Sequence, residues 1–322
     1  MGPLGTPSAY ALAADGAFVV TCAAPTVHEA ERYAPFVLAR RVVRELADGA
    51  TGGGIATLPG HAKTALSLVF DDDCTAAALL RLLERDPMLA GAVLQAASTA
   101  RYATGAGRPM TLRDAVLRLG VLGMRPVLLE AIGRAYLFQG PAARAVAAIF
   151  EHSLRVANVC AVLARFGSSA AATGPWQDER TRQAAFACGL FHDVGRVHVL
   201  AVASSILPAA PAAVVARACE IAHADVGAAL VARWGLPPAV VEAVERHHGL
   251  FPDPRIGPPV WHAGHLVALA ESLIRTWKQG ADGVPAGAPE RWPAPWPMLL
   301  DEPEGTVRLH RALEVVLGPP SP

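Results

Sequence analysis

The 322-residue sequence lacks several features that mark common classes of protein. Lysine occurs only as Lys63 and Lys278, and the 28 basic residues balance the 28 acidic ones. A chain without net charge has no general attraction to nucleic acids or anionic membranes, so we expect neither as a partner. Alternating apolar patterns of the kind found in strands are nearly absent, and we therefore predict an all-α protein.

Paired cysteines are missing as well. The five cysteines form no C-x-x-C pair and are odd in number, as expected for a reduced cytoplasmic protein. The N-terminus has no basic flank followed by an apolar core, so no signal peptide is predicted. Serines and prolines interrupt Val199–Val215, the most apolar long run, so no membrane span is predicted either.

What is present is a series of apolar patterns with helical spacing, separated by proline and glycine. A helix is expected over Glu29–Leu46, and Gly140-Pro141 separates two helical lobes. We predict a variable N-terminal segment and linker over 1–54 and an N-terminal helical lobe over 55–140. A second helical lobe over 141–280 and a Pro-rich loop with a short C-terminal helix over 281–322 complete the chain. The first segment is expected to carry the specificity for partners.

Several helix starts can be predicted from capping residues. Asp86-Pro87 and Thr111 suit the N-termini of two helices, and the acidic run Asp71–Asp73 suits the start of a helix over Ala76–Arg85. Gly120 is expected to end or bend the helix that follows Thr111.

The sequence around His192-Asp193 is the most informative for function. Small and apolar residues from Phe186 lead to this pair, which fits a buried helix that ends at Gly195. A neutral imidazole beside a carboxylate offers nitrogen and oxygen ligands to a catalytic divalent metal. A buried aspartate is uncommon unless it is paired or coordinating.

Further polar residues lie in apolar helical settings. Those of the second lobe are His152, His192, Asp193, His223, His247, His248 and Glu271. They come from five predicted helices, and no local spacing joins them. A single buried histidine is more often a hydrogen-bonded core residue than a ligand, but seven such groups favour a shared pocket. His198, His262 and His265 are expected at the solvent or the lobe boundary.

The order of these residues resembles a known ligand series. His152, His192-Asp193, His223 and His247-His248 are similar to the metal ligands of the HD superfamily of phosphohydrolases. Gly189–Arg196 resembles the H-D-I-G-K signature of its cyclic-di-GMP phosphodiesterase branch, with Arg196 in place of lysine.

Other segments narrow the resemblance to the HDOD family, a group of bacterial signalling modules related to HD phosphohydrolases. They are Leu58-Pro59, Glu84–Pro87, Ala96–Tyr102, Ala115–Gly120, Ala222–Gly227 and Trp234–Pro237, within a match that spans about 55–277. The resemblance implies a two-lobed helical fold whose C-terminal lobe is an HD-like bundle. The sequence departs from the family pattern at Ala97-Ser98, where HDOD proteins usually have Asn-Ser. The glycine-tyrosine-proline motif is missing after Gly249, and Glu271 stands where the last ligand is usually aspartate.

Two functions are compatible with this resemblance. The first is a bacterial regulatory module that acts through signalling proteins or a small ligand, such as a nucleotide or cyclic dinucleotide, with a partly retained metal pocket. The second is an active metal-dependent phosphohydrolase of nucleotide or cyclic-nucleotide phosphoesters. The polar residues could also be a relic of the ancestral site that hydrogen-bond to one another.

If metal is bound, the resemblance implies one or two ions, with iron or manganese fitting the ligand set better than magnesium. His152, His192, Asp193 and Glu271 would hold the first ion, and His223, His247 and His248 the second. Asp193 and Arg196 would be the catalytic residues, the arginine offsetting charge on phosphoryl oxygens.

Overall fold

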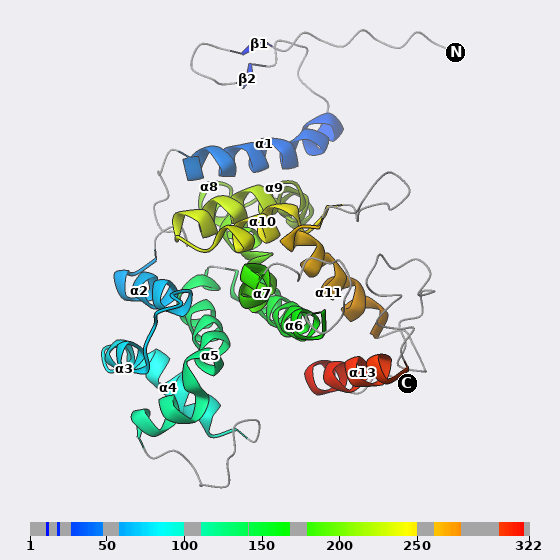
Figure 1. Cartoon of the computed structure of the whole chain (residues 1–322). Coiled ribbons are helices and arrows are strands. Elements are labelled where there is room, and N and C mark those ends of the chain that lie inside the picture. Colours follow the sequence, from blue (N-terminus) through cyan, green and yellow to red (C-terminus); the bar gives the residue numbers. More distant parts are fainter. Residues whose placement is uncertain are drawn as a thin grey trace.

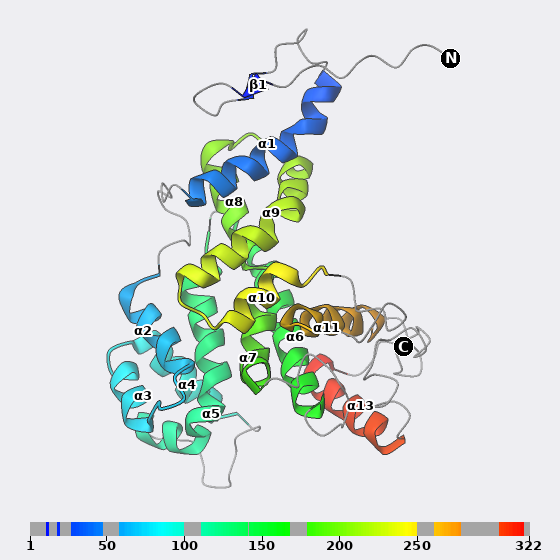
Figure 2. The same cartoon turned by 45° about the horizontal axis from the view of Figure 1, so that its top comes forward.

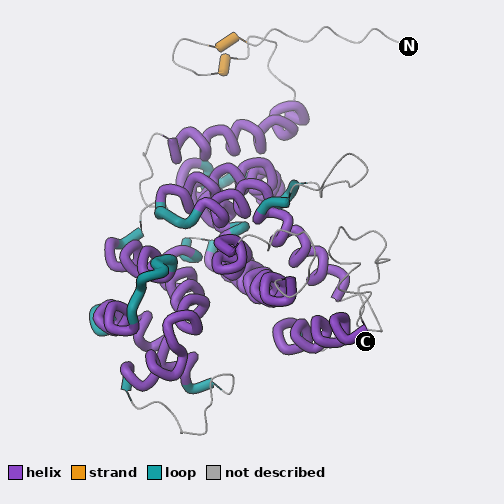
Figure 3. Tube along the Cα trace, in the orientation of Figure 1, coloured by secondary structure: helices purple, strands orange, loops and turns teal. Residues whose placement is uncertain are grey.

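Helices make up nearly all of the regular structure in the computed structural model of this protein (Figures 1 and 3). The structure describes residues 11–12, 18–19, 27–47, 58–99, 111–140, 142–167, 179–249, 261–277 and 303–318. Two two-residue strands, β1 (Ala11–Leu12) and β2 (Phe18–Val19), pair antiparallel near the N-terminus. The predicted all-α class is confirmed.

The first group of helices after α1 forms one side of the molecule. It consists of α2 (Gly60–Val69), α3 (Ala76–Leu83), α4 (Pro87–Ala97), α5 (Leu112–Ile132) and the π-helical turn η2 (Gly133–Leu137). Helices α2, α3 and α4 pack against α5. The part of the predicted Pro-rich loop before residue 303 lies outside the described residues, as does the end of the predicted N-terminal segment and linker, 48–54. Residues 55–57 and 100–110 also lie outside them.

Local capping chemistry explains where these helices begin. The Asp86 carboxylate accepts from the backbone amides of Met88 and Leu89, as predicted for the start of α4. Thr111 and Asp114 form a capping box at the start of α5. Helix α3 begins at Ala76 as predicted but ends at Leu83, two residues before the predicted end. Thr75 supplies its cap, and the acidic run Asp71–Asp73 precedes that cap.

Gly120 bends α5, one of the two outcomes expected from sequence. Its φ of 65° lies in the left-handed region, which favours glycine because other residues clash there. The helix resumes beyond Gly120, and α5 contacts α7. Gly120 therefore sets the direction in which α5 meets the second group of helices.

The second group contains the larger part of the core. Its helices are α6 (Ala143–Gly167), α7 (Glu179–Phe191), α8 (Val194–Ile206), α9 (Ala212–Arg233), α10 (Pro238–Arg246), α11 (Ala263–Trp277) and α13 (Pro303–Leu317). Helix α7 packs along α6, and α8 packs along α9. Helix α13 is the short C-terminal helix predicted within 281–322; it buries Leu309 and Leu313 and lies against α6 (Figure 2).

The helix before His192 ends earlier than predicted. Helix α7 stops at Phe191, and α8 begins at Val194, so Gly195 lies inside a second helix and is not a helix end. Gly195 is there because α8 and α9 approach closely. A Cβ atom on Gly195 would lie 1.9 Å from the carbonyl oxygen of His223.

Helix α1 (Val27–Ala47) packs across α9 and the end of α8 (Figures 1 and 2). It buries Leu38, Ala39, Val42 and Leu46 in the common core. Arg233 of α9 also donates to the carbonyl of Leu46 at 3.0 Å. This part of the predicted N-terminal segment is therefore an integral layer of the molecule.

Among the described residues, two stretches are long and apolar enough to cross a membrane by length and composition. They are Ala143–Phe166 and Glu179–Ile206. In the most apolar window of the first stretch 44% is buried inside the molecule, and in that of the second 78% is buried. Helices in a protein core pass the same test, so length and composition alone do not make either stretch a membrane span.

Candidate metal centre

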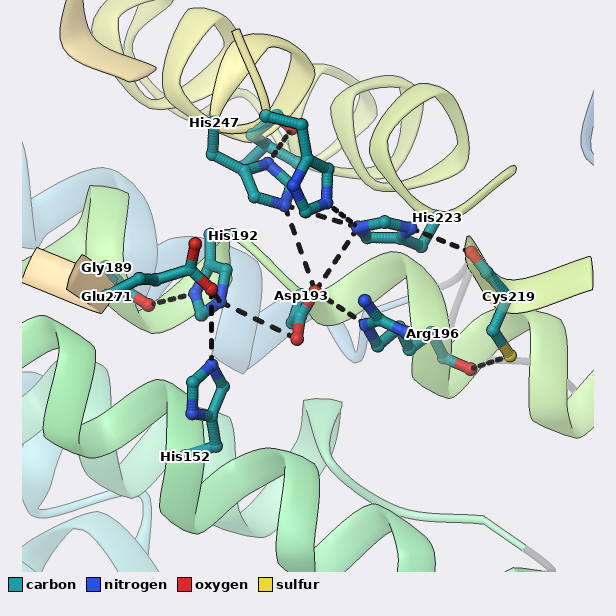
Figure 4. A network of polar contacts seen from close by, with 11 residues as sticks. His152, Gly189, His192, Asp193, Arg196, Cys219, His223, His247 and Glu271 are labelled. Atoms are coloured by element: carbon teal, nitrogen blue, oxygen red, sulfur yellow. Dashed lines mark hydrogen bonds and ion pairs between the residues drawn. The ribbon is translucent and has the colours of Figure 1, made fainter. Parts of the chain in front are cut away.

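The predicted polar residues converge from five places in the second group of helices (Figure 4). His152 comes from the middle of α6, the His192-Asp193 pair forms the junction of α7 and α8, and His223 comes from α9. His247 and His248 follow directly after α10, and Glu271 comes from α11. No pair of these elements is local in sequence, so tertiary packing alone creates the cluster.

The first group of side chains contains His152, His192 and Glu271, whose ligand atoms all lie within 4.8 Å of one another. Glu271 Oε1 is 3.6 Å from His152 Nε2 and 3.7 Å from His192 Nε2. His192 is fully buried, whereas His152 is partly open to solvent. The extra methylene of glutamate therefore does not keep its carboxylate out of the pocket.

The second group contains His223, His247 and His248, again with ligand atoms within 4.8 Å of one another. His223 Nε2 lies 2.9 Å from His248 Nε2 and 3.2 Å from His247 Nε2. His223 and His247 are buried, and His248 is exposed. This group therefore reaches from the core to the surface.

Asp193 lies between the two groups. Its Oδ2 is 3.6 Å from His192 Nε2, and its Oδ1 is 3.4 Å from His223 Nε2 and 3.9 Å from His247 Nε2. Arg196, one turn further along α8, donates from Nε to Oδ1 at 2.8 Å. One carboxylate thus faces both imidazole groups, while the guanidinium holds it in place.

Backbone carbonyls fix the orientation of three imidazoles. The Nδ1 atoms of His192, His223 and His247 each lie 2.7 Å from a carbonyl, those of Gly189, Cys219 and Val244. A carbonyl can only accept, so each Nδ1 carries the proton and each neutral ring presents a bare Nε2 lone pair. These three lone pairs all point into the pocket.

Burial keeps these rings neutral. It lowers the pKa of His223 to about 4, with Arg196 adding to the effect, and the pKa of His247 to about 3, with His192 adding to it. Burial also lowers the pKa of His192, although Asp193 and Glu271 oppose that shift. The contacts between these histidines and the carboxylates are therefore not ion pairs near neutral pH.

The two carboxylates remain charged. Burial alone would raise the pKa of Asp193, but Arg196 outweighs it together with His192 and His223, whose rings are protonated in the acid range where this group titrates. Together they hold the pKa of Asp193 well below its usual range. Burial likewise opposes ionisation of Glu271, yet His152 and His192 lower its pKa. The pocket thus combines neutral imidazoles with ionised oxygens.

This combination fits a metal ion. His192 Nε2 is buried, has no hydrogen-bond partner and faces two carboxylates, and His223 Nε2 faces His247 Nε2 with no proton to share. Acceptors placed opposite acceptors repel unless a cation lies between them. Nitrogen ligands with carboxylate oxygens suit first-row transition metals such as iron or manganese.

Two of the three other histidines considered from sequence differ from the prediction made for them. His198 and His265 are buried, with 0% and 2% of their surface exposed, so they do not face solvent. His198 lies inside α8, and neither ring nitrogen has a hydrogen-bond partner. His262 is half-buried and stacks on His265 with ring centroids 3.5 Å apart. The sequence alone does not show which faces of a helix other elements will cover, so the burial of His198 and His265 could not be predicted.

A second polar cluster was not anticipated. Tyr136 donates to Asp86 Oδ2 at 2.9 Å, and His61 lies edge-on to the Tyr136 ring. Burial and the bond to Asp86 raise the pKa of Tyr136 to about 12. The Asp86 cap was visible in the sequence, but Tyr136 is 50 residues away and carries no local signal. This cluster ties α4 to η2.

Comparisons with known proteins identify the family and the fold of the chain. Residues 55–250 match the sequence model of the HDOD domain. The chain is 27% identical over 162 residues to Ribonuclease Y of Deinococcus radiodurans, an alignment that covers 50% of this chain and 21% of the relative. The chain therefore spans about a fifth of the length of that relative.

Solved structures share the fold. A provisionally assigned metal-dependent phosphohydrolase from Shewanella amazonensis SB2B superimposes with a TM-score of 0.59 at 18% identity, covering 88% of this chain and 99% of the other. A provisionally assigned signal transduction protein from Marinobacter aquaeolei VT8 gives a TM-score of 0.53 at 20% identity over 91% of this chain and 66% of the other. With the domain match over more than half of its length, the chain belongs to the HDOD family.

Proposed function

We propose that this protein is a regulatory HDOD module whose HD-type pocket holds one or two divalent metal ions. It would act through signalling proteins or a small ligand, in the bacterial cytoplasm. The family match and the likeness to signal-transduction and phosphohydrolase folds support the class. Residues 55–140 and 141–280 would form its two lobes.

One observation carries the metal proposal. Asp193 lies between two three-residue groups of nitrogen and oxygen ligands. Within them the Nε2 lone pairs of His192, His223 and His247 face carboxylate oxygens or one another without a proton to share. A relic site that had become a hydrogen-bonded core would pair donors with acceptors. His152, His192 and Glu271 would hold one ion and His223, His247 and His248 the other, with Asp193 between them.

The chain's own residues would do the remaining work. A bound ion would supply Lewis acidity toward a phosphoryl oxygen. Asp193 is kept ionised and is oriented by Arg196, whose guanidinium is about a quarter exposed. That guanidinium can also reach toward a phosphate that enters past His152 or His248, the more open members of the pocket.

A thermal-shift titration tests the proposal. Chelator-stripped protein is titrated with Mn²⁺, and the melting temperature is expected to rise by about 5 °C at a hundredfold excess over Kd. His192→Ala and Asp193→Ala should abolish the rise, while His61→Ala, outside the pocket, should keep it. A rise that persists in both pocket variants would place the metal elsewhere, and no rise in the wild type would favour the relic.

A second function, phosphoester hydrolysis, is favoured by the Arg196–Asp193 contact at 2.8 Å. This contact places a fixed cation beside a carboxylate that faces both ligand groups, an arrangement suited to stabilising charge on a transferring phosphoryl group. Metal-loaded protein would then hydrolyse bis-p-nitrophenyl phosphate or cyclic dinucleotides. Arg196→Ala would lower kcat per bound metal ion, with the metal content measured alongside because Arg196 also orients Asp193. Metal binding without turnover of any of these substrates would leave the regulatory role alone.

A further inference from the structure

The two oxygens of the Asp193 carboxylate have different surroundings (Figure 4). Oδ2 lies 3.6 Å from His192 Nε2 and so faces the first ligand group. Oδ1 lies 3.4 Å from His223 Nε2 and 3.9 Å from His247 Nε2, and it faces the second group. Each ligand group therefore has its own oxygen of the shared carboxylate.

A cation already lies on the oxygen that faces the second group. The Arg196 guanidinium donates from Nε to Asp193 Oδ1 at 2.8 Å, which is closer than either imidazole nitrogen. The contact is local, because Arg196 follows Asp193 by one turn and its amide also donates to the Asp193 carbonyl at 3.0 Å. An arginine side chain cannot lose its proton in a protein. The second group therefore faces a carboxylate oxygen that a permanent positive charge shares.

The two groups also differ in negative charge. The first group contains a carboxylate of its own, Glu271, in addition to Oδ2 of Asp193. The second group consists of three imidazoles, and among the described residues Asp193 supplies the only carboxylate within 4.0 Å of their ring nitrogens. Two carboxylates would neutralise a divalent ion in the first group. The second group offers one carboxylate, and that one is already paired with Arg196.

Burial makes the charge of Arg196 effective at the second group. Asp193 and His223 are 7% and 1% exposed, so solvent screens the repulsion between the guanidinium and a divalent ion only weakly. The Arg196 side chain itself is 26% exposed. The guanidinium can therefore leave Oδ1 toward solvent without passing through the core.

We propose that Arg196 makes the two ligand groups unequal. The first group binds a divalent ion readily, and the second binds one only weakly while the guanidinium of Arg196 pairs with Asp193 Oδ1. This inference rests on the proposed metal-binding function and adds to it the order in which the two ions bind. Arg196 acts here as a positioning residue, since it affects the ion through Asp193 and through its charge.

The inequality gives the pocket a way to respond to an anionic ligand. An anion that draws the guanidinium away from Oδ1 removes a positive charge from the second group and strengthens binding of the second ion. By linkage, the second ion strengthens binding of that anion by the same factor. The number of bound ions then reports whether the ligand is present.

A different role for Arg196 predicts the opposite effect of its removal. If the guanidinium only orients Asp193, a neutral hydrogen-bond donor at this position would leave the second ion unchanged or weaken it. If the charge opposes the ion, the same neutral donor would strengthen it. Arg196→Gln is such a substitution, and Arg196→Lys keeps the charge.

Isothermal titration calorimetry of the chelator-stripped full chain with Co²⁺ tests the proposal. Co²⁺ is the probe because imidazole-rich sites bind it more tightly than Mn²⁺. The wild type is expected to bind one ion tightly and a second with a dissociation constant at least about tenfold higher. Arg196→Gln should lower this second constant at least about fivefold and change the first by less, whereas Arg196→Lys should titrate as the wild type does.

Two further variants assign the second step. Arg196→Gln/His248→Ala should lose the strengthened ion, because His248 belongs to the second group only and is exposed, so its removal leaves the core intact. Arg41→Gln removes an exposed arginine of α1 that pairs with Glu45, and it should titrate as the wild type does. Matched melting curves recorded without Co²⁺ are expected to show that all variants fold.

Three results would overturn the inference and leave the proposed function in place. They are two steps of equal affinity in the wild type, a second step that Arg196→Gln leaves unchanged or weakens, and the same strengthening in Arg196→Lys as in Arg196→Gln. Absence of any Co²⁺ binding by both the wild type and Arg196→Gln would instead overturn the proposed metal site, and the inference with it.

Discussion

At the scale of single residues, the pocket depends on which nitrogen of each imidazole carries its proton. His192, His223 and His247 each donate from Nδ1 to a carbonyl three or four residues earlier in the chain. That local bond aims Nε2 at Asp193 and at the neighbouring rings. The sequence could indicate the residue types, but not this orientation, because the carbonyls of Gly189, Cys219 and Val244 have no side-chain signature.

His198 offers a prediction that is independent of the metal. An unfolded chain protonates this ring near its ordinary value of 6.5, whereas burial, with Arg233 adding to it, lowers the folded pKa to about 4. Above the unfolded value both states are neutral, and below it the unfolded state binds a proton that the folded state refuses. Stability is therefore lost as pH falls from about 6.5 toward about 4.

The size of this loss can be measured by urea unfolding in the presence of a chelator. When the pH falls from about 7.5 to about 5, His198 should lower the free energy of unfolding of the wild type by roughly 2 kcal/mol. The free energy of unfolding of His198→Leu should fall by roughly 2 kcal/mol less over the same range. Removing two buried, unpartnered ring nitrogens should also leave the variant at least as stable at the higher pH. An equal loss in both proteins would mean that His198 does not stay neutral.

At the scale of elements, the meeting of α8 and α9 sets the geometry of the centre. Gly195 allows the two backbones to touch, so that Asp193 at the start of α8 reaches His223 on α9. A glycine after a helix usually predicts its end, and this is why the sequence-based boundary at Gly195 was wrong. Close helix packing and helix termination both favour glycine, and only the structure shows which of the two applies at Gly195. The caps at Asp86 and Thr111 could be predicted because their bonding partners lie within three residues.

Gly195→Ala should therefore separate α8 from α9. The added methyl group would lie 1.9 Å from the His223 carbonyl oxygen and 2.7 Å from the Gly227 nitrogen, both of them backbone atoms that cannot rotate away. We expect a loss of about 3 kcal/mol or more in the free energy of unfolding, together with loss of the metal-induced thermal shift.

The matched control is Gly91→Ala on α4, where a Cβ atom meets nothing within 4 Å. Chemical denaturation should show this variant to be as stable as the wild type or more so, because alanine has the higher helix propensity. If Gly195→Ala also unfolds like the wild type, the close contact of α8 and α9 does not hold the site together.

At the scale of the whole molecule, the order of the polar residues along the chain indicated the pocket before any contact was known. It could not show that Glu271 reaches His152 and His192, because that depends on how α11 packs against α6. Nor could it show that α1 forms a layer over α9, since an amphipathic helix after an irregular start is equally compatible with a detached segment. Both features depend on packing between elements that are far apart in sequence, which the sequence alone does not show.

The central claim is that folding assembles two ligand groups on either side of Asp193. Metal content, measured by plasma mass spectrometry on protein purified without chelator, tests it most directly. We predict about one or two equivalents of iron or manganese in the wild type, a reduced content in His152→Ala and in His223→Ala, and almost none in Asp193→Ala. A wild type that is free of metal, or a content that all three substitutions leave unchanged while the proteins remain folded, would contradict the account.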